Sequence, residues 1–581
     1  MLKKDQIPDV SDKPSFFVPF VIGVTGHRDL RLEDILLLEK RVRSVLDDFR
    51  RRLPSTPLVV LSALAEGADQ LVARVALQCG LQLAAVLPMP TTIYRAQMET
   101  QAQQSFDELL SKASLVLSVT ANGVSDVQLK ESEEARAQVY DALGIFLAKQ
   151  SQVLIALWDG MPSEKKGGTA RVVRYMLEGP PACTNLGDNE LDTGIVYQIM
   201  TPRTSSEAPD REIAKLRLLT CLDGMPDKGP AEFEVSAQRL EAFNRDVAKI
   251  DVSGSPACGT LVPEESSRLI SAYERRVSQV YYAADKCSLD FNGWTSIALV
   301  TILGFAFVAL ASFEIYAHVL PHNAMVWLVY PIALLGAWLT YRIARKRDVE
   351  TKYLDYRALA EALRVQFFWS LAGVGEAAAD HYLRDHRTEL DWIRFALRSI
   401  SIYETRTNAR GQDEVHRMVL ALNHWVGHQA SWYAAKSKQQ QTILKRLDHI
   451  SGRFLFAVWF VSMLIPISLL TRHPGLAGWQ KWASEEPHHG LLLLLIPLPS
   501  VAFGLFRVWV EQAGYDVQAR KYHHMAQVFR RAADRLKEYL KQSKIEEARD
   551  ILRRLGVDAL EENGDWLILH REHPLRVVGS P

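Results

Sequence analysis

The chain has 581 residues, too many for one hydrophobic core and enough for about three or four structural units. Its 68 Lys and Arg residues equal its 68 Asp and Glu residues, so no excess of positive charge points to direct binding of nucleic acid. The five cysteines are scattered without a C-x-x-C pair, which argues against a disulfide framework or a metal site and favours reduced thiols in the cytosol.

The N-terminal part of the chain alternates short apolar segments with amphipathic ones. After a polar tail at 1–15, residues 16–201 are expected to form an α/β domain, a Rossmann-like doubly wound sheet covered by helices. Amphipathic patterns at Leu32–Arg52, Ala68–Cys79 and Glu131–Ala148 supply predicted helices. The predicted strands are Pro19–Val24, Pro57–Ser62, Gln82–Pro88, Leu115–Val119, Gln152–Trp158 and Gly194–Thr201. Residues 202–265 are expected to be a linker or irregular segment.

Glycine and polar residues gather where four of these strands end, and parallel sheets bind ligands at that edge. Glycines and helix N-termini bring backbone N–H groups close to a phosphate, Arg28 can pair with it, and Asp69 or Asp159 can accept ribose hydroxyls. A single glycine more often marks a tight turn, but four loops at one edge predict a nucleotide site. The expected ligand-binding residues are Gly23, Thr25, Gly26, His27, Arg28, Glu66, Gly67, Asp69, Pro88, Tyr94, Trp158, Asp159, Gly160, Gly167, Gly168 and Thr169.

His27 has two interpretations that the sequence leaves open. It can serve as a general acid or base, or it can be a loop histidine that holds its own backbone. The chain contains neither the P-loop pattern G-x-x-x-x-G-K-[ST] nor the G-x-G-x-x-G fingerprint. Nucleotide binding is therefore expected without either standard motif, and no other cofactor is expected.

Four apolar segments follow, about Trp294–Ser312, Ala324–Tyr341, Phe454–Leu470 and Leu491–Phe506. Each is about 16–19 residues long, at the short end of what crosses a bilayer core of about 30 Å. They contain almost no charge and carry aromatic residues near their ends, which favours membrane helices over buried helices of a soluble domain. An all-α membrane region of two hairpins is expected.

Basic residues predict the orientation of these hairpins. Arg342, Arg345, Lys346 and Arg347 follow the second segment, whereas the short loop before that segment contains no Lys or Arg. Positive-inside counting places both hairpin loops outside and both termini in the cytosol. The expected protein is a multi-pass protein of the cell inner membrane.

The two hairpins carry one duplicated pattern. The first unit, 266–370, has Tyr282-Ala283-Ala284-Asp285-Lys286 before its hairpin and Asp355–Arg364 after it. The second unit, 421–545, has Tyr433-Ala434-Ala435-Lys436-Ser437 and Lys521–Arg530 at the same places. A helical cytosolic connector is expected at 371–420 and a C-terminal tail at 546–581. Lys436 stands where the first copy has Asp285, so the second copy is the more degenerate.

These motifs resemble two known families. Gly23–Arg28, Glu66–Gln70, the Pro88–Tyr94 turn, Trp158–Gly160 and Gly167–Thr169 together resemble the SLOG superfamily of nucleotide-binding Rossmann-like domains, which includes the Lonely Guy phosphoribohydrolases. The Tyr-Ala-Ala motif, the hairpin and the following Tyr-containing helix resemble SLATT domains, the two-helix membrane effectors that accompany SLOG sensors. The resemblance implies a sensor of a nucleotide-derived signal joined to a pore-forming effector in bacterial conflict or antiviral defence.

The same resemblance leaves an enzymatic alternative. Lonely Guy enzymes place a catalytic glutamate three residues after the threonine of their glycine motif, and Val172 occupies that position here. This departure favours binding without hydrolysis over a membrane-tethered nucleotide-processing enzyme, such as a phosphoribohydrolase or N-glycosidase. The expected partners are a small nucleotide ligand, the lipid bilayer, further copies of the chain in a homo-oligomer, and an enzyme that makes the signal. A transporter is disfavoured because ionisable residues are almost absent at membrane depth.

Overall fold

The computed structural model describes residues 16–119, 124–163, 166–179, 194–204, 212–220, 230–251, 261–382, 390–403, 412–470, 475, 477–485, 488–495, 497–512 and 515–572. The expected tail 1–15 and parts of 202–265, 371–420 and 546–581 lie outside the described residues. Two compact units are interleaved along the chain. The first comprises Met1–Ala284, Leu359–Ser370 and Gly375–Arg410; the second comprises Asp285–Ala358, Leu371–Val374 and Gly411–Pro581.

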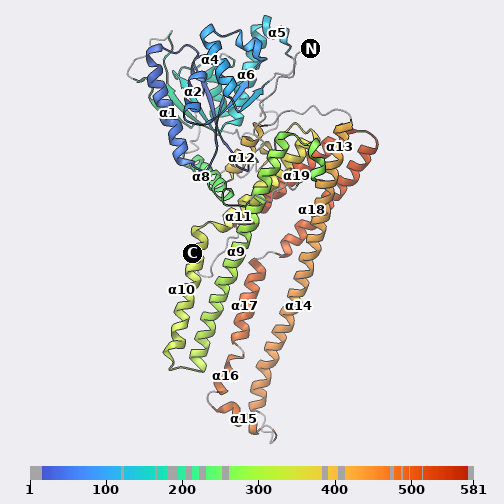
Figure 1. The fold of residues 1–581 in the computed structure, drawn as a ribbon. Coiled ribbons are helices and arrows are strands. Elements are labelled where there is room, and N and C mark those ends of the chain that lie inside the picture. The colour runs from blue at the N-terminus through green and yellow to red at the C-terminus, as the bar shows by residue number, and fades with distance from the viewer. Residues whose placement is uncertain are drawn as a thin grey trace. The chain divides into compact units, whose positions relative to one another are not determined.

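The first unit is built on a seven-stranded sheet with strand order β4-β3-β2-β1-β5-β6-β7 (Figure 1). All neighbouring pairs are parallel except β6 and β7, so the predicted α/β class is confirmed. The predicted strands agree with the observed ones to within two residues. The strands are β1 Phe20–Gly26, β2 Leu58–Ser62, β3 Gln82–Leu87, β4 Leu115–Ser118, β5 Val153–Trp158, β6 Ile195–Met200 and β7 Leu216–Leu219.

Helices cover both faces of this sheet because its central strands are apolar on both sides. Every residue of β2 and β5 is buried, as expected for parallel strands between two helical layers. Leu143 of α6 and Val173 of α7 pack into the core on one face, and Phe49 of α1 stacks near Phe20 and Tyr197 on the other. The helices are α1 Ile35–Arg52, α2 Ala68–Gln78, α3 Thr91–Arg95, α4 Thr100–Lys112, α5 Asp126–Glu131, α6 Glu133–Gln150 and α7 Thr169–Glu178.

Two further helices, α8 and α12, belong to the first unit. Residues 202–265, expected to be irregular, contain α8 Pro230–Val247, which has no glycine and buries Leu240 and Phe243. The buried side-chain amide of Asn244 donates to the Val18 carbonyl at 2.8 Å, which holds α8 against the segment just before β1. Helix α12, Asp391–Ser401, packs near the same place, where Gln152 Nε2 donates to the Phe395 carbonyl.

The described residues of the second unit are all helical, and four helices in the described part of the chain are long and apolar enough to cross a membrane. The two spanning hairpins are α9 Ala272–His318 with α10 Ala324–Lys346, and α14 His428–Leu470 with α17 Pro497–Gln512 (Figure 1). Their apolar side chains, such as Trp327 and Trp459, are more than half exposed, which suits lipid and not water. Helices α9 and α14 are much longer than the expected spans, because they continue into the polar Tyr-Ala-Ala segments.

Each hairpin is followed by a helix that returns along the long one. These are α11 Val349–Ala372 and α18 Tyr515–Lys541. The other helices are α13 Gln412–Ala421, α15 Ala477–Ser484, α16 His488–Leu494 and α19 Ile545–Glu572, with a π-helical turn at Leu422–Gly427. Helices α9 and α11 contribute residues to both units.

The duplicated motifs explain this return packing. In the first copy Asp285 of α9 pairs with Arg357 of α11, with Oδ1 and Nη1 2.9 Å apart. In the second copy Tyr433 of α14 packs against Tyr522 and Phe529 of α18, with ring centroids 5.8 and 5.6 Å apart. The motif residues thus join the same two helices in each copy, by an ion pair in one and by aromatic rings in the other.

Candidate functional site

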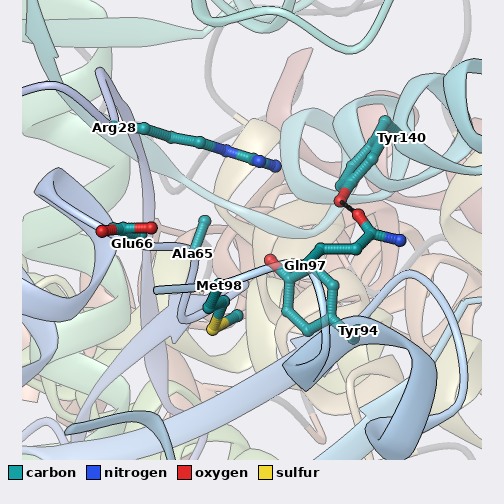
Figure 2. Close-up of a pocket in the computed structure, with 7 residues that line it drawn as sticks. All are labelled: Arg28, Ala65, Glu66, Tyr94, Gln97, Met98 and Tyr140. Carbon is teal, nitrogen blue, oxygen red and sulfur yellow. Dashed lines mark hydrogen bonds between the residues drawn. The ribbon is translucent and has the colours of Figure 1, made fainter. Parts of the chain in front are cut away.

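A small pocket lies over the carboxyl ends of β1, β2 and β3, beside the point where strand order reverses between β1 and β5. Figure 2 shows the seven residues that line it. Its volume is about 10 Å³, the space of a single water molecule. The β1–α1 loop contributes Arg28, the β2–α2 loop Ala65 and Glu66, the segment from α3 onward Tyr94, Gln97 and Met98, and helix α6 Tyr140.

Tyr94 carries the most informative atom in the pocket. The residue is 1% exposed, and its hydroxyl has no hydrogen-bond partner among the residues that the structure describes. Burial raises the pKa of this phenol well above its usual value, so the group is a neutral donor and acceptor. A buried hydroxyl without a partner costs roughly 1–3 kcal/mol, and such groups in native proteins call for an explanation. A bound ligand with a polar atom would remove this cost.

Arg28 supplies positive charge at the same place. Its guanidinium carbon lies 5.4 Å from the centre of the Tyr140 ring, and among the described residues it forms no ion pair with a carboxylate. Burial works to lower the pKa of Arg28, but neighbouring Tyr140, Tyr94 and Asp69 outweigh it and the pKa is raised. The Tyr140 hydroxyl donates to Gln97 Oε1 at 2.9 Å, which closes the pocket on its outer side (Figure 2). A fixed cation beside aromatic rings suits an anionic ligand with a planar group.

Asp69 lies just beneath this pocket, in the first turn of α2. Burial raises the pKa of its carboxyl to about 7, although backbone N–H groups of Ala65 and Ala63 donate to it and oppose the shift. Leu64, between those two donors, has φ of +54°, a conformation that costs a non-glycine residue about 1 kcal/mol or more. Asp69 therefore holds a strained loop in place, and Ala65 and Glu66 of that loop line the pocket.

His27 and Asp159 are engaged with each other and not with the pocket. The backbone N–H of Asp159 donates to His27 Nε2 at 3.1 Å, and burial lowers the pKa of the imidazole, so the ring is neutral. Arg203 Nε donates to Asp159 Oδ2 at 3.1 Å. Of the two interpretations of His27, the geometry fits the histidine that holds backbone, here the ends of β1 and β5.

The predicted glycines allow close packing between loops. A Cβ on Gly26 would lie 2.3 Å from the Cβ of Ala68, and one on Gly67, where φ is +83°, would lie 2.3 Å from the Arg28 carbonyl oxygen. A Cβ on Gly167 would lie 2.3 Å from Tyr140 Cβ, and one on Gly23 would lie 2.3 Å from Ser151 Oγ. These four positions bring backbone against neighbouring elements, and loops that carry pocket residues depend on them.

The structure places the remaining predicted residues nearby but outside the pocket lining. Thr25 is buried in β1, Pro88 follows β3, and Gly168 precedes Thr169 at the N-terminus of α7. Trp158 ends β5 and donates from Nε1 to the Met161 carbonyl, and Gly160 is in the turn beyond it with φ of +83°. Of the sixteen predicted residues, Arg28, Glu66 and Tyr94 line the pocket.

Sequence reasoning missed Gln97, Met98 and Tyr140. Gln97 and Met98 lie in a turn after the short helix α3, and Tyr140 lies in the middle of α6, two elements away from the glycine loops. None of them belongs to a glycine motif or to a strand end. The sequence signal available for Tyr140 was a tyrosine in the middle of a predicted helix, and such a tyrosine is only weak evidence of a binding site.

Comparison with known proteins gives no further guide to this site. Neither protein-family models nor curated protein sequences produce a match to the chain. Among the described residues, no group of three or more His, Cys, Asp and Glu side chains is placed to hold a metal ion.

Proposed function

We propose that the chain is a sensor of a nucleotide-derived ligand coupled to a pore-forming membrane effector, of the SLOG and SLATT kind that the motifs resemble, acting in bacterial conflict or antiviral defence. The sensor is supported by the buried Tyr94 hydroxyl, which has no partner in the described part of the chain and lies beside Arg28 at the edge where parallel sheets bind ligands. Four apolar helices in the same chain support the effector.

The ligand class follows from the chemistry around Tyr94. Arg28 can pair with a phosphate oxygen, Tyr140 can stack on a base, and the Tyr94 hydroxyl can bond to a ring nitrogen or sugar hydroxyl. Ligand pockets for such molecules measure about 300 Å³ or more, far above the 10 Å³ found here. Binding must therefore separate Tyr140 and Gln97 from Arg28, and the closed and open states differ in affinity, which gating requires.

Within the first unit, a packed route leads from the sheet to the first residues of helix α9. Tyr403 packs against the hydrophobic core of the sheet, and the Arg276 guanidinium carbon lies 3.7 Å from the centre of the Tyr403 ring. Arg276 is on α9, whose later residues form the first membrane-spanning segment. A shift of the sheet against Tyr403 would therefore displace Arg276 and the start of that helix.

The effector part of the proposal has the chain in the inner membrane, with both termini in the cytosol. Four spanning helices enclose too little space for a pore of useful width, so several copies are expected to assemble. The enzymatic alternative, a membrane-tethered nucleotide-processing enzyme, has less support. Val172 stands where the Lonely Guy enzymes have their glutamate, and it is 4% exposed and packs into the sheet core.

Tyr94→Phe tests the sensor because it removes one atom. If the hydroxyl awaits a ligand, the variant without ligand should be about 1 kcal/mol more stable than wild type. Its affinity for the active compound should fall about tenfold. Thermal shift of the purified full-length protein, with nucleoside mono-, di- and triphosphates and a nucleotide extract of infected cells, measures both quantities.

Tyr175→Phe is the matched control, since that hydroxyl is partnered, donating to Asp141 Oδ1 at 2.8 Å, and lies outside the pocket. It should lose stability and keep ligand affinity. Equal affinity in wild type and Tyr94→Phe would contradict the site. Release of free base by the wild-type protein would instead support the enzyme.

A further inference from the structure

The end of the second membrane-spanning helix carries a dense basic cluster, and its position relative to the bilayer can be read from its neighbours. Helix α10 is apolar from Ala324 to Tyr341 and then exposes four cations within six residues. These residues, the α10 basic cluster, are Arg342, Arg345, Lys346 and Arg347. Exposed apolar side chains such as Leu335 and Leu339 lie just before them on the same helix.

Tryptophans mark this level as a membrane interface. Trp338 is 54% exposed, and the Arg342 guanidinium carbon lies 5.7 Å from the centre of its ring. On the partner helix α9, Phe291 lies three residues before the exposed Trp294, and Lys352 Nζ of α11 lies 5.0 Å from the centre of the Phe291 ring. Helix α9 runs antiparallel to α10, with Phe305 against Gly336 and Phe313 against Tyr330, so Trp294 lies near the level of the cluster. Trp338 lies one helical turn before Arg342, and exposed tryptophans beside basic residues are typical of the headgroup region of a bilayer.

The cluster has no negative partner within the described part of the chain. None of its four side chains forms an ion pair with a carboxylate there, and the polar contact of Arg345 is with the Tyr341 hydroxyl, at 3.1 Å. By contrast, Arg520 of α18 pairs with Asp516 at 2.9 Å, and Arg507 of α17 lies 4.0 Å from Asp448. Four unpaired cations side by side repel one another, and an anion between them removes that repulsion.

We infer that the α10 basic cluster binds the phosphate headgroups of anionic phospholipids. A lipid fits better than a soluble phosphate because the acyl chains would lie along the apolar surface of Leu335 and Leu339, while the headgroup meets the cations. Each Lys or Arg near an anionic bilayer surface strengthens binding by about fivefold, so a cluster of four is selective for anionic lipid. The inference does not depend on the nucleotide ligand.

The bound headgroup also fixes the turn into the next helix. Arg347 caps the C-terminal end of α10, and Asp348, with φ of +48°, separates it from α11, which begins at Val349. A positive φ at a non-glycine residue is strained, so this turn depends on its surroundings. A lipid phosphate held by Arg345 and Arg347 would restrain the angle between the spanning helix and α11.

The test compares lipid retention by the purified full-length protein. Wild type is mixed in detergent with equal amounts of phosphatidylglycerol and phosphatidylcholine, and the bound lipid is counted by native mass spectrometry. We expect at least tenfold preference for phosphatidylglycerol, which falls at least tenfold in R342Q/R345Q/K346Q/R347Q and is weakened by salt. The variant R342K/R345K/R347K keeps the charge and the membrane orientation, and it should keep most of the preference.

The matched control removes four exposed cations of α18, far from any apolar span, as R530Q/R531Q/R535Q/K537Q. It should retain the wild-type preference. The inference is overturned if wild type shows no preference, if the glutamine variant of the cluster retains it, or if both quadruple variants lose it equally. Displacement of the lipid by millimolar glycerol phosphate would also overturn it, because the site would then bind any soluble phosphate.

Discussion

Asp69 links the pocket to pH at the scale of a single residue. Burial raises its pKa to about 7 in the folded chain, above the 3.8 of an exposed aspartate. Between about pH 4 and pH 7, the Asp69 carboxyl is therefore protonated in the folded chain and ionised in the unfolded chain. A group with a raised pKa contributes its stability below about pH 4, and that contribution is lost as the pH rises through 7.

Asp69→Asn should remove this pH dependence, because the amide stays neutral and can still accept the N–H groups of Ala65 and Ala63. We expect the variant to be roughly 1–3 kcal/mol more stable than wild type at pH 8 and nearly equal to it at pH 4.5. Thermal unfolding of the full-length protein at both values measures the difference. Asp126→Asn, at an exposed position, should show no such change. A constant difference at both pH values would refute the account.

Glycine substitutions in the same region do not separate loss of a ligand contact from loss of loop packing. A bulky residue at Gly26 would be expected to abolish binding if the glycine touched phosphate. The structure gives a second reason for the same loss, since any Cβ there would overlap Ala68. Tyr94→Phe distinguishes the two causes of lost binding, because it removes a possible ligand contact and leaves the loop backbone unchanged.

The ion pair between Asp285 and Arg357 shows how one residue position distinguishes the two hairpins. The equivalent positions of the second copy are Lys436 and His523, which cannot pair. Asp285→Lys should therefore weaken the α9–α11 contact, and Asp285→Lys with Arg357→Asp should restore it. Since both side chains are about a quarter exposed, a double-mutant cycle should give a coupling of about 0.5–1 kcal/mol. Additive effects would show that the pair does not join the helices.

At the scale of elements, the C-terminal helix α19 joins the two hairpins. It contacts α11 through the buried amide of Asn563, which donates to the Ala358 carbonyl at 3.0 Å, and through an ion pair of Arg571 with buried Asp355. It also packs on α18, where Gln518 Nε2 lies 3.4 Å from His570 Nε2. One helix thus touches the return helix of each copy, and the two hairpins are coupled through it.

Removing one member of the Arg571 pair tests this coupling. Asp355→Ala leaves the guanidinium partly buried without its carboxylate, and we expect a loss of about 2–4 kcal/mol of stability. Asp355→Leu with Arg571→Met should cost less than the single change, because no charge is left alone. Asp448→Ala serves as control, since that carboxyl is 62% exposed and pairs with Arg507 at the surface. Thermal unfolding in detergent measures all three.

Most of the elements could be predicted from sequence, and the exceptions have physical reasons. Strands β1 to β6 are continuous apolar runs, and the four spans are long and uncharged, so each carries its own signal. Strand β7 was missed because Leu216 and Leu218 are exposed at an edge and alternate with a charged residue. Helix α19 was expected only as a tail, because its apolar side chains are buried only through contacts with α11 and α18, which the sequence alone does not show.

The candidate site was less predictable than the fold. Strand ends drew attention to the edge of the sheet where the pocket lies, and three of the predicted residues, Arg28, Glu66 and Tyr94, line it. Asp159 and His27 are residue types that often bind ligands, but here they form hydrogen bonds with each other. Which polar residues are already partnered depends on contacts across many residues, and residue type alone does not contain that information.

At the scale of the whole molecule, the membrane orientation decides whether ligand and pocket share a compartment. A nucleotide signal made in the cytosol reaches Arg28 only if the sheet is cytosolic. Positive-inside counting puts it there and puts the loop between α9 and α10 outside, near exposed His322. The turn between α18 and α19, at exposed Ser543, should be inside.

Cysteine labelling of intact cells measures this arrangement. In a variant without native cysteines, His322→Cys should react with a membrane-impermeant maleimide, whereas Ser543→Cys should react only after the inner membrane is permeabilised. Both positions are exposed, so a difference in labelling reports the side of the membrane and not burial. Four candidate spans separate Ser543 from the first residues of α9, so both positions lie on the same side of the membrane. Labelling of Ser543→Cys from outside would therefore place the start of α9 and the sheet outside, away from cytosolic nucleotides. The sensor would then need an extracellular ligand, and the proposed role in defence would lose its premise.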